Sequence, residues 1–160
     1  MGELIERGRN IARLIRSMLL DDGPPSRPVL RAVIEVLDVR MTYRNRYLDN
    51  IQPNAVFDLA ITDETNPNSI GFQLAELLMH VDQLPHEGQT PLRTEEKRLI
   101  MAAIHRVRML TPEDLADRER VRVRRAVESV DQHLTDLADT LERNYLVRVG
   151  GPRQLLAGPE

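Results

Sequence analysis

Hydrophobic residues recur every three or four positions along most of the chain, which is the spacing of one face of an α-helix. No stretch alternates apolar and polar residues as a strand would. The pattern predicts helices at about residues 3–20, 28–50, 53–60, 67–84, 92–110 and from 112 to just before Gly150. The predicted fold is therefore all-α, a helical bundle of about five to six helices with short connections. We expect residues 1–150 to form one domain and residues 151–160 a flexible tail.

The clearest helix start is at Asn66-Pro67, because asparagine is a favoured N-cap and proline fits the first helical position. The helix that follows has two nearly opposite apolar faces. One face carries Ile70, Leu74, Leu77, Leu78, Val81 and Leu84, and the other carries Phe72, Ala75 and Met79. Only a narrow stripe is polar throughout, formed by Gln73, Glu76, His80 and Gln83. A helix that is apolar on two sides is usually packed between others, so we predict residues 67–84 as the central helix.

The predicted helix at 28–50 carries charged residues on its apolar side. At about 100° per residue, Arg40 and Arg44 fall inside the apolar arc. The same arc also holds two tyrosines, Tyr43 and Tyr47. Since a buried arginine needs a compensating partner, we expect a carboxylate to contact Arg40 or Arg44. The acids expected to supply it are Asp63, Glu64 and Glu6. An interhelical ion pair, a cavity for an anionic ligand and a solvent-exposed helix end are the three explanations left open.

Two polar patterns have weaker functional meaning. Glu6, Asn10 and Arg13 lie at i, i+4 and i+7 of the first predicted helix, an arrangement that most often faces solvent. Glu76 and His80 are four residues apart and could supply two metal ligands. However, neither a Glu-x-x-His nor a His-Glu-x-x-His motif is present, so no metal site is predicted.

Composition narrows the possible classes of function. The chain has 22 basic and 25 acidic residues, and the net charge of −3 argues against general nucleic-acid binding. The one basic run, residues 118–125, has no aromatic residue to stack on bases, and it predicts a solvated helix face or a docking patch for an acidic partner. Zero cysteines exclude disulfides and thiolate chemistry. With no membrane-spanning segment and no phosphate-binding glycine loop, we expect a cytoplasmic protein without a membrane association or cofactor.

Four short motifs occur in order along the chain. They are Glu6-Arg7-x-x-Asn10-x-Ala12-Arg13-Leu14, Met41-Thr42-Tyr43-Arg44-Asn45-Arg46-Tyr47-Leu48, Asp63-Glu64-Thr65-Asn66-Pro67-Asn68-Ser69-x-x-Phe72-Gln73-Leu74, and Pro152-Arg153-Gln154. Together they resemble the bacterial alpha-E domain, an all-helical family of unestablished biochemical function. The resemblance spans nearly the whole chain and matches the C-terminal half of a longer domain. It departs at Asn68, where the family usually has arginine, and at Gly2-Glu3, where it has Gly-Arg.

The resemblance also implies a context for function. Alpha-E domains accompany, or are fused to, circularly permuted ATP-grasp proteins and transglutaminase-like proteins. The favoured hypothesis is an accessory helical domain of an ATP-grasp amidoligase system, which binds a partner enzyme, a peptide or an anionic ligand. The matched polar residues would hold the fold or line the binding cleft: Glu6, Arg7, Asn10, Arg13, Tyr43, Arg44, Tyr47, Asp63, Glu64, Asn66 and Gln73.

Two alternatives remain open. The first is an enzyme in its own right, in which Glu6 or Glu64 acts as general acid or base and Arg44 holds a carboxylate or phosphate. The second is a purely structural bundle that self-associates into a homo-oligomer.

Overall fold

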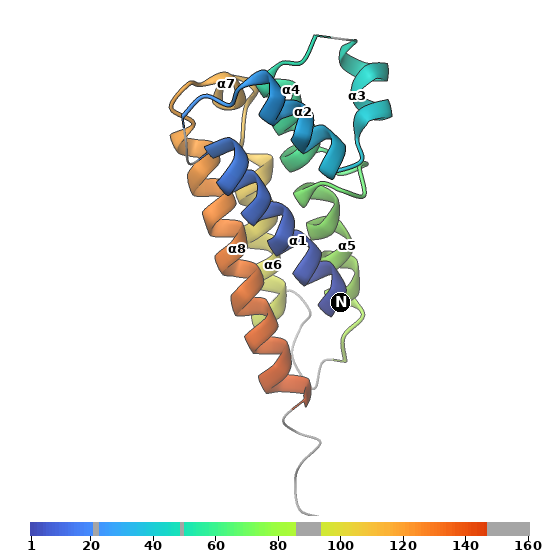
Figure 1. Cartoon of the computed structure of the whole chain (residues 1–160). Coiled ribbons are helices and arrows are strands. Elements are labelled where there is room, and N and C mark those ends of the chain that lie inside the picture. Colours follow the sequence, from blue (N-terminus) through green and yellow to red (C-terminus); the bar gives the residue numbers. More distant parts are fainter. Residues whose placement is uncertain (21–22, 49, 86–93, 147–160) are drawn as a thin grey trace, which may run out of the picture.

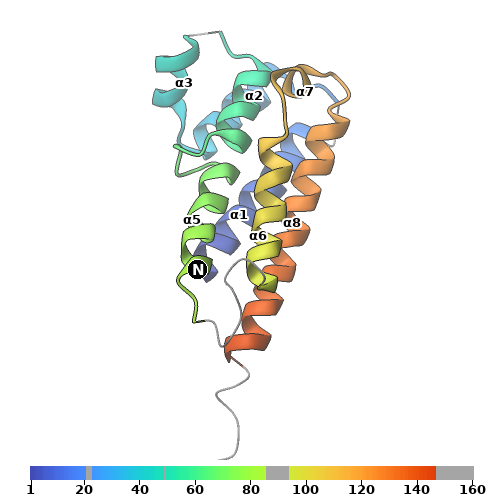
Figure 2. The same ribbon diagram turned by 180° about the vertical axis from the view of Figure 1, so that it is seen from behind.

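Four long helices lie side by side in a bundle. They are α1 (Gly2–Ile15), α5 (Ile70–Asp82), α6 (Glu95–Arg108) and α8 (Val121–Leu141). Each packs against two others, in the order α1, α5, α6, α8 and back to α1 (Figures 1 and 2). The structure, a computed structural model, describes residues 1–20, 23–48, 50–85 and 94–146. Every regular element in that part of the chain is a helix, so the all-α prediction is confirmed.

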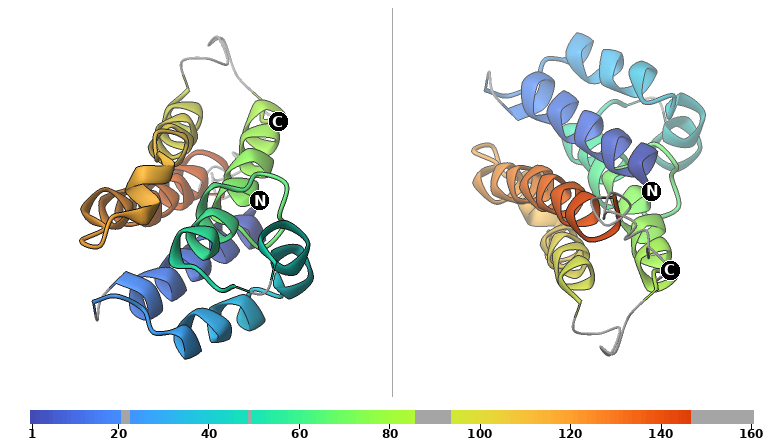
Figure 3. Two further views of the ribbon diagram at one scale, coloured as in Figure 1. Left: turned by 90° about the horizontal axis from the view of Figure 1, so that it is seen from above. Right: turned by 90° about the horizontal axis from the view of Figure 1, so that it is seen from below.

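Four short helices cover one end of the bundle. They are α2 (Arg27–Val36), α3 (Arg40–Tyr47), α4 (Pro53–Phe57) and α7 (Pro112–Ala116). This end layer is at the top of Figure 1 and is viewed from above in Figure 3. Its helices are held together through α4, which contacts α2, α3 and α7. Wider π-helical turns extend α1, α4 and α8: η1 (Arg16–Leu20), η2 (Asp58–Thr62) and η4 (Glu142–Leu146).

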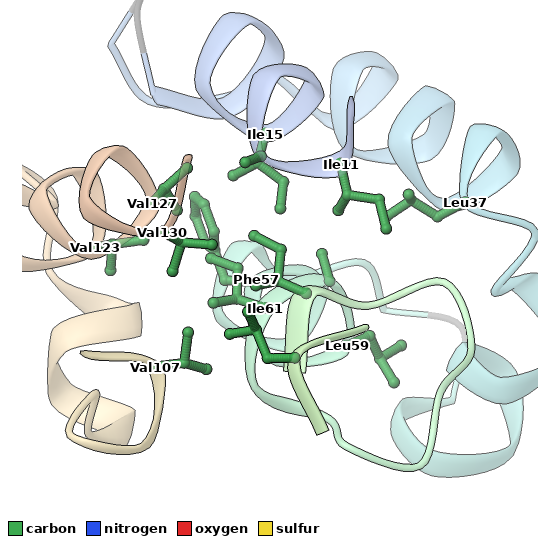
Figure 4. Close-up of a cluster of buried hydrophobic side chains, with 14 of the residues drawn as sticks. Ile11, Ile15, Leu37, Phe57, Leu59, Ile61, Val107, Val123, Val127 and Val130 are labelled. Atoms are coloured by element: carbon green, nitrogen blue, oxygen red, sulfur yellow. The ribbon is translucent and has the colours of Figure 1, made fainter. Parts of the chain in front are cut away.

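One hydrophobic core joins the bundle to the end layer. Phe57 is fully buried where α1, α8 and the α4–η2 segment meet, close to Ile15 and Val130 (Figure 4). A narrow apolar seam runs along α8 and faces this core, and five of its residues are buried: Val123, Val127, Val130, Leu134 and Leu137. Burying a side chain of this size contributes about 1.5–3 kcal/mol, so the seam is a main source of the bundle's stability.

Two of the predicted helices are each split, so the described residues form eight α-helices rather than five or six. The helix predicted at 28–50 ends at Val36 and restarts at Arg40, and Asp38 between them has a φ of 51°. The last predicted helix breaks between α7 and α8, where Arg120 has a φ of 50°. A residue with left-handed backbone angles ends a right-handed helix. No glycine or proline marks either break, so neither break has a local sequence signal.

The predicted start and position of α5 are also wrong. The helix begins at Ile70, and its N-cap is Ser69, whose Oγ accepts a hydrogen bond from the Phe72 backbone N–H at 3.0 Å. Asn66-Pro67 instead belongs to the turn before the helix. The prediction of α5 as the central helix fails because its second apolar face is not buried, and Phe72 and Ala75 there are only partly covered. On its second face Met79 is 53% exposed.

Some predictions fall outside the described residues, namely the loop at 86–91, the tail at 151–160 and the motif Pro152-Arg153-Gln154. Among the helices that the structure does describe, none has the length and apolar character needed to cross a membrane.

Candidate functional site

A groove along one side of α1 contains three of the predicted site residues. Glu6, Arg7 and Asn10 lie on its rim, together with Asn68 from the loop before α5. The floor is apolar and consists of Ile11, Leu14, Val36 and Leu37. The cavity volume is about 520 Å³, within the size range of ordinary ligand pockets. We call this feature the α1 groove. The groove brings residues of the first sequence motif close to Asn68 of the third motif, although about 60 residues of chain separate them.

The charged groups of the α1 groove are only loosely held. Arg7 donates to Glu3 at 3.3 Å, but the two side chains are 48% and 84% exposed. An exposed pair of this kind contributes little to stability, so the Arg7 guanidinium can exchange partners readily. Glu6 is exposed and forms no hydrogen bond or ion pair with any described residue. Glu3 also lines the groove, so the rim offers two carboxylates, a guanidinium and two amides to an incoming molecule.

Asn66 holds the loop that places Asn68 on this rim. The Asn66 side chain is buried, with its Nδ2 donating to the Leu59 carbonyl at 2.9 Å. Its Oδ1 accepts from the Asn68 backbone N–H at 3.1 Å. Asparagine is suited to this double role because one amide supplies both a donor and an acceptor. Asn66 is thus a supporting residue behind the groove rather than a residue that a ligand would reach.

Gln73 is a second buried supporting residue. It was predicted to lie in a polar stripe, yet it is fully buried, and its Nε2 donates to the Pro67 carbonyl at 2.5 Å. Its Oε1 is buried without a hydrogen-bond partner among the described residues. A Cβ added at Gly8 would lie 3.6 Å from the Gln73 Cβ and 2.9 Å from Leu134 Cδ1. The glycine therefore allows α1 to pack closely against both α5 and α8.

A smaller groove of about 340 Å³ borders the other side of α1. Glu6 and Asn10 reach it too, and Arg13, the last member of the predicted stripe, lines it. Beneath it, Arg9 donates to Asp131 at 3.1 Å and ties α1 to α8. Glu6 and Asn10 are consequently accessible from both sides of the helix.

The expectation that Arg40 and Arg44 are buried is wrong. Both side chains are exposed, because the break at Asp38 turns α3 away from the arc calculated for one continuous helix. They line a groove of about 380 Å³ with Arg31 and Tyr43, which we call the α3 groove. One acid, Glu35, also lines it, but three arginines around one concave surface still make it a candidate for anion binding.

The two tyrosines of the second motif are structural anchors for α3. Tyr43 is buried, and its hydroxyl donates to the Asn50 carbonyl and accepts from the Gln52 N–H, each at 2.9 Å. The Tyr47 hydroxyl donates to Asp58 at 2.6 Å. Burial, followed by the hydrogen bond to this carboxylate, raises the pKa of Tyr47 to about 12. Both side chains fix the loop between α3 and α4.

Asp63 and Glu64 meet arginines other than the expected Arg40 and Arg44. Asp63 accepts from Arg46 at 2.6 Å, and Glu64 binds Arg108 through two hydrogen bonds of 2.6 and 2.9 Å. Burial alone would raise the pKa of Asp63, but hydrogen bonds from Thr65 and Arg46 outweigh it and hold that pKa below its usual value. The second of these pairs links the loop before α5 to the end of α6.

The geometry required by the enzyme hypothesis is not assembled among the described residues. Glu6 lies at the α1 groove, Arg44 lies at the α3 groove, and Glu64 is engaged by Arg108. Neither the α1 groove, the α3 groove nor the smaller groove beside α1 holds Arg44 together with either acid. Nor do three or more histidine or acidic side chains come close enough there to hold a metal ion.

Residues 1–146 match the model of a family described as a predicted alpha-helical domain with a conserved ER motif. The chain belongs to the alpha-E family. It is also 27% identical, over 166 aligned residues, to uncharacterised proteins of Mycobacterium bovis and Mycobacterium tuberculosis. The alignment covers all of this chain but only 18% of each relative, so the chain spans less than a fifth of their length. No solved structure matches this alpha-E domain.

Glu-Arg pairs occur three times in this alpha-E domain, at Glu6-Arg7, Glu119-Arg120 and Glu142-Arg143. Of these, Glu6-Arg7 lines the α1 groove. The second pair has a different position, because Arg120 is turned into the interior and is only 6% exposed.

Arg120 and Arg124 are important residues that the sequence reasoning missed. Both belong to the basic run that was expected to be a solvated helix face or a docking patch for an acidic partner. The Arg120 side chain lies over the Phe57 ring, 5.5 Å from its centre, and donates to the carbonyls of Leu19 and Gly23. Arg124 donates to the Leu20 carbonyl. Burial lowers the pKa of Arg120. The two arginines satisfy carbonyl groups left open where η1 ends, a role that depends on the fold and has no sequence signature.

Replacing Glu64 by glutamine should reduce the acid sensitivity of this domain. The hydrogen bonds from Arg108 hold the pKa of Glu64 below its usual value, so the unfolded chain binds the proton more readily. The Glu64–Arg108 ion pair therefore stabilises the fold fully above about pH 4.5. This stabilisation is lost as the pH falls through the lower pKa that Glu64 has in the folded protein. Because both side chains are partly exposed, we expect a difference below about 1 kcal/mol. Urea unfolding of E64Q and the parent at pH 7 and pH 3 measures it, and an unchanged pH dependence would contradict it.

Proposed function

We propose that this alpha-E domain is an accessory helical domain of an ATP-grasp amidoligase system. In this proposal the α1 groove binds a segment of the ATP-grasp partner enzyme or of its peptide substrate. The observation that carries the proposal is the composition of the groove, in which Glu6, Arg7, Asn10 and Asn68 surround an apolar floor. Amide side chains can bind a peptide backbone, while a carboxylate and a guanidinium can bind the charged groups of a peptide.

Exposed apolar surface in the α1 groove supports the same proposal. Val36 lies at the end of α2 on the floor of the groove, and it is 64% exposed. Specific binding surfaces combine an apolar centre with a polar rim, and the α1 groove has both. Its rim ion pair, Arg7 with Glu3, is weak enough to be exchanged for a partner's carboxylate without a large cost to the fold.

Site-specific cross-linking tests this proposal. The full chain would carry the photoreactive residue p-benzoylphenylalanine at position 36 and be co-expressed with an ATP-grasp protein of the same organism. The matched control carries the same group at position 79 on α5, because Met79 is 53% exposed and does not line the groove. We expect an adduct with the ATP-grasp protein from position 36 and none from position 79.

A charge reversal gives the second measurement. Arg7→Glu should reduce co-purification of the ATP-grasp protein by about tenfold or more, a change of about 1.4 kcal/mol in binding. Equal adducts from both positions, or co-purification unaffected by Arg7→Glu, would show that the α1 groove is not the contact surface. An adduct between two copies of this chain from position 36 would support the self-associating bundle instead.

A further inference from the structure

A groove between α6 and α8 is not used by the proposed function. Its rims are basic, with His105 and Arg106 on α6 and Arg122 and Arg125 on α8, and its floor includes Met109 and Ala126. The cavity volume is about 430 Å³. The two helices lie side by side along the bundle (Figure 2). The residues that line the groove belong to the C-terminal end of α6 and the first half of α8. We call this feature the α6–α8 groove.

The charge of this groove is opposite to that of the whole chain. Of the described residues that line it, three are arginines, one is a histidine and none is acidic, whereas the chain has a net charge of −3 with histidine counted as neutral. Arg106 and Arg125 are exposed, and neither forms an ion pair within the described part of the chain. Arg122 is 60% exposed and is bound to Asp114 at 3.0 Å, so its charge is partly neutralised. The groove therefore concentrates positive charge that the rest of the fold leaves uncompensated.

The floor of the groove adds an apolar contact between the two basic rims. Met109 is 53% exposed there, and methionine adapts its shape to apolar partners of several kinds. A surface for single-stranded nucleic acid would also be basic, but it usually presents aromatic rings for stacking bases. Phe, Tyr and Trp are absent from the described residues that line this groove.

We propose that the α6–α8 groove binds an acidic segment of a partner protein that carries an apolar residue between its carboxylates. Arg122 and Arg125 are three residues apart and share one face of α8, while Arg106 approaches from α6. Carboxylates of the segment pair with the two rims, and the apolar residue between them rests on Met109. Arginine suits this role because its guanidinium binds carboxylates through paired hydrogen bonds.

The test measures direct binding of a defined probe to the full chain. A fluorescein-labelled peptide of repeating Glu-Glu-Leu is titrated, and fluorescence anisotropy is followed at low and at high salt. The double variant Arg106→Glu and Arg125→Glu should weaken binding by about tenfold or more. The matched control is Arg16→Glu and Arg98→Glu, which changes the net charge equally at two exposed arginines that do not line the groove.

A neutral variant separates the apolar contact from the charge. Met109→Gln should weaken binding of the Glu-Glu-Leu peptide several-fold but leave a Glu-Glu-Ser peptide nearly unaffected. Circular dichroism of every variant confirms that the helices are retained, as expected for exposed positions. Equal losses in the two double variants would overturn the proposal, because they would indicate attraction by overall charge alone. Tighter binding of a single-stranded oligonucleotide of equal charge, or no peptide binding at all, would also overturn it.

This experiment is independent of the one proposed for the α1 groove. The two grooves share no lining residue and lie on different helix pairs. A chain that loses the acidic peptide on reversal of Arg106 and Arg125 should still be cross-linked from position 36, and the Arg7→Glu variant should still bind the peptide.

Discussion

Replacing Phe57 by alanine is expected to destabilise this alpha-E domain by about 3–5 kcal/mol, the usual cost of removing a buried aromatic side chain. Phe57 is fully buried where α1, α8 and the end layer meet, so its loss leaves a cavity that no single helix can close (Figure 4). The substitution also removes the ring beneath the Arg120 guanidinium. A domain of this size is stable by only about 5–15 kcal/mol, so the loss is a large fraction of the total.

Equilibrium urea unfolding, followed by circular dichroism, measures this effect. Val36→Ala is the matched control, because Val36 is 64% exposed and its truncation should change the free energy of unfolding by less than about 0.5 kcal/mol. A loss below about 1 kcal/mol for Phe57→Ala would mean that the bundle and the end layer do not share one core.

Gln73→Glu is expected to have the second large effect, with a characteristic dependence on pH. Gln73 is fully buried and donates from Nε2 to the Pro67 carbonyl. An ionised carboxylate there would face that oxygen without a donor, so burial raises the pKa of the new side chain in the folded state. A shift of two to three units costs about 3–4 kcal/mol at pH 7. The cost falls as the pH is lowered through the raised folded pKa and disappears below the pKa of the unfolded chain.

Urea unfolding of the Gln73→Glu variant and the parent between pH 4 and pH 8 measures the difference. Gln73→Met keeps the length of the side chain without an ionisable group. It should lose about 1–2 kcal/mol, because the Pro67 carbonyl loses its donor, and this loss should not vary with pH. If Gln73→Glu were as stable as the parent at pH 8, position 73 would be open to water.

Sequence periodicity predicted the long helices well because burial acts on each of them in the same way. The seam from Val123 to Leu137 repeats at helical spacing, and all its residues face the core. Such a pattern requires only that one face of the helix be buried and the other exposed to solvent. The α1 groove was also partly predictable, since Glu6, Arg7 and Asn10 are neighbours on a single helix and reach the same surface.

Partners across the fold were much harder to predict. At least one of Asp63, Glu64 and Glu6 was expected to contact Arg40 or Arg44, but Glu64 binds Arg108, which lies 44 residues further along the chain. The error came from treating residues 28–50 as one helix. A break at Asp38 needs only one residue with a φ of 51°, and aspartate tolerates that conformation without any neighbouring glycine or proline. The arc calculated for a straight helix then no longer describes α3.

The sequence by itself determined the all-helical class, the apolar faces of the long helices and the polar residues of α1, because these depend on spacing within a single helix. Only the tertiary structure decided where two helices break, which arginine each acid binds, and that Gln73 and Arg120 are buried. Those features depend on contacts between segments far apart in the chain, such as Arg120 with the carbonyls of Leu19 and Gly23. These contacts contribute to the free energy of folding only when the bundle and the end layer pack together.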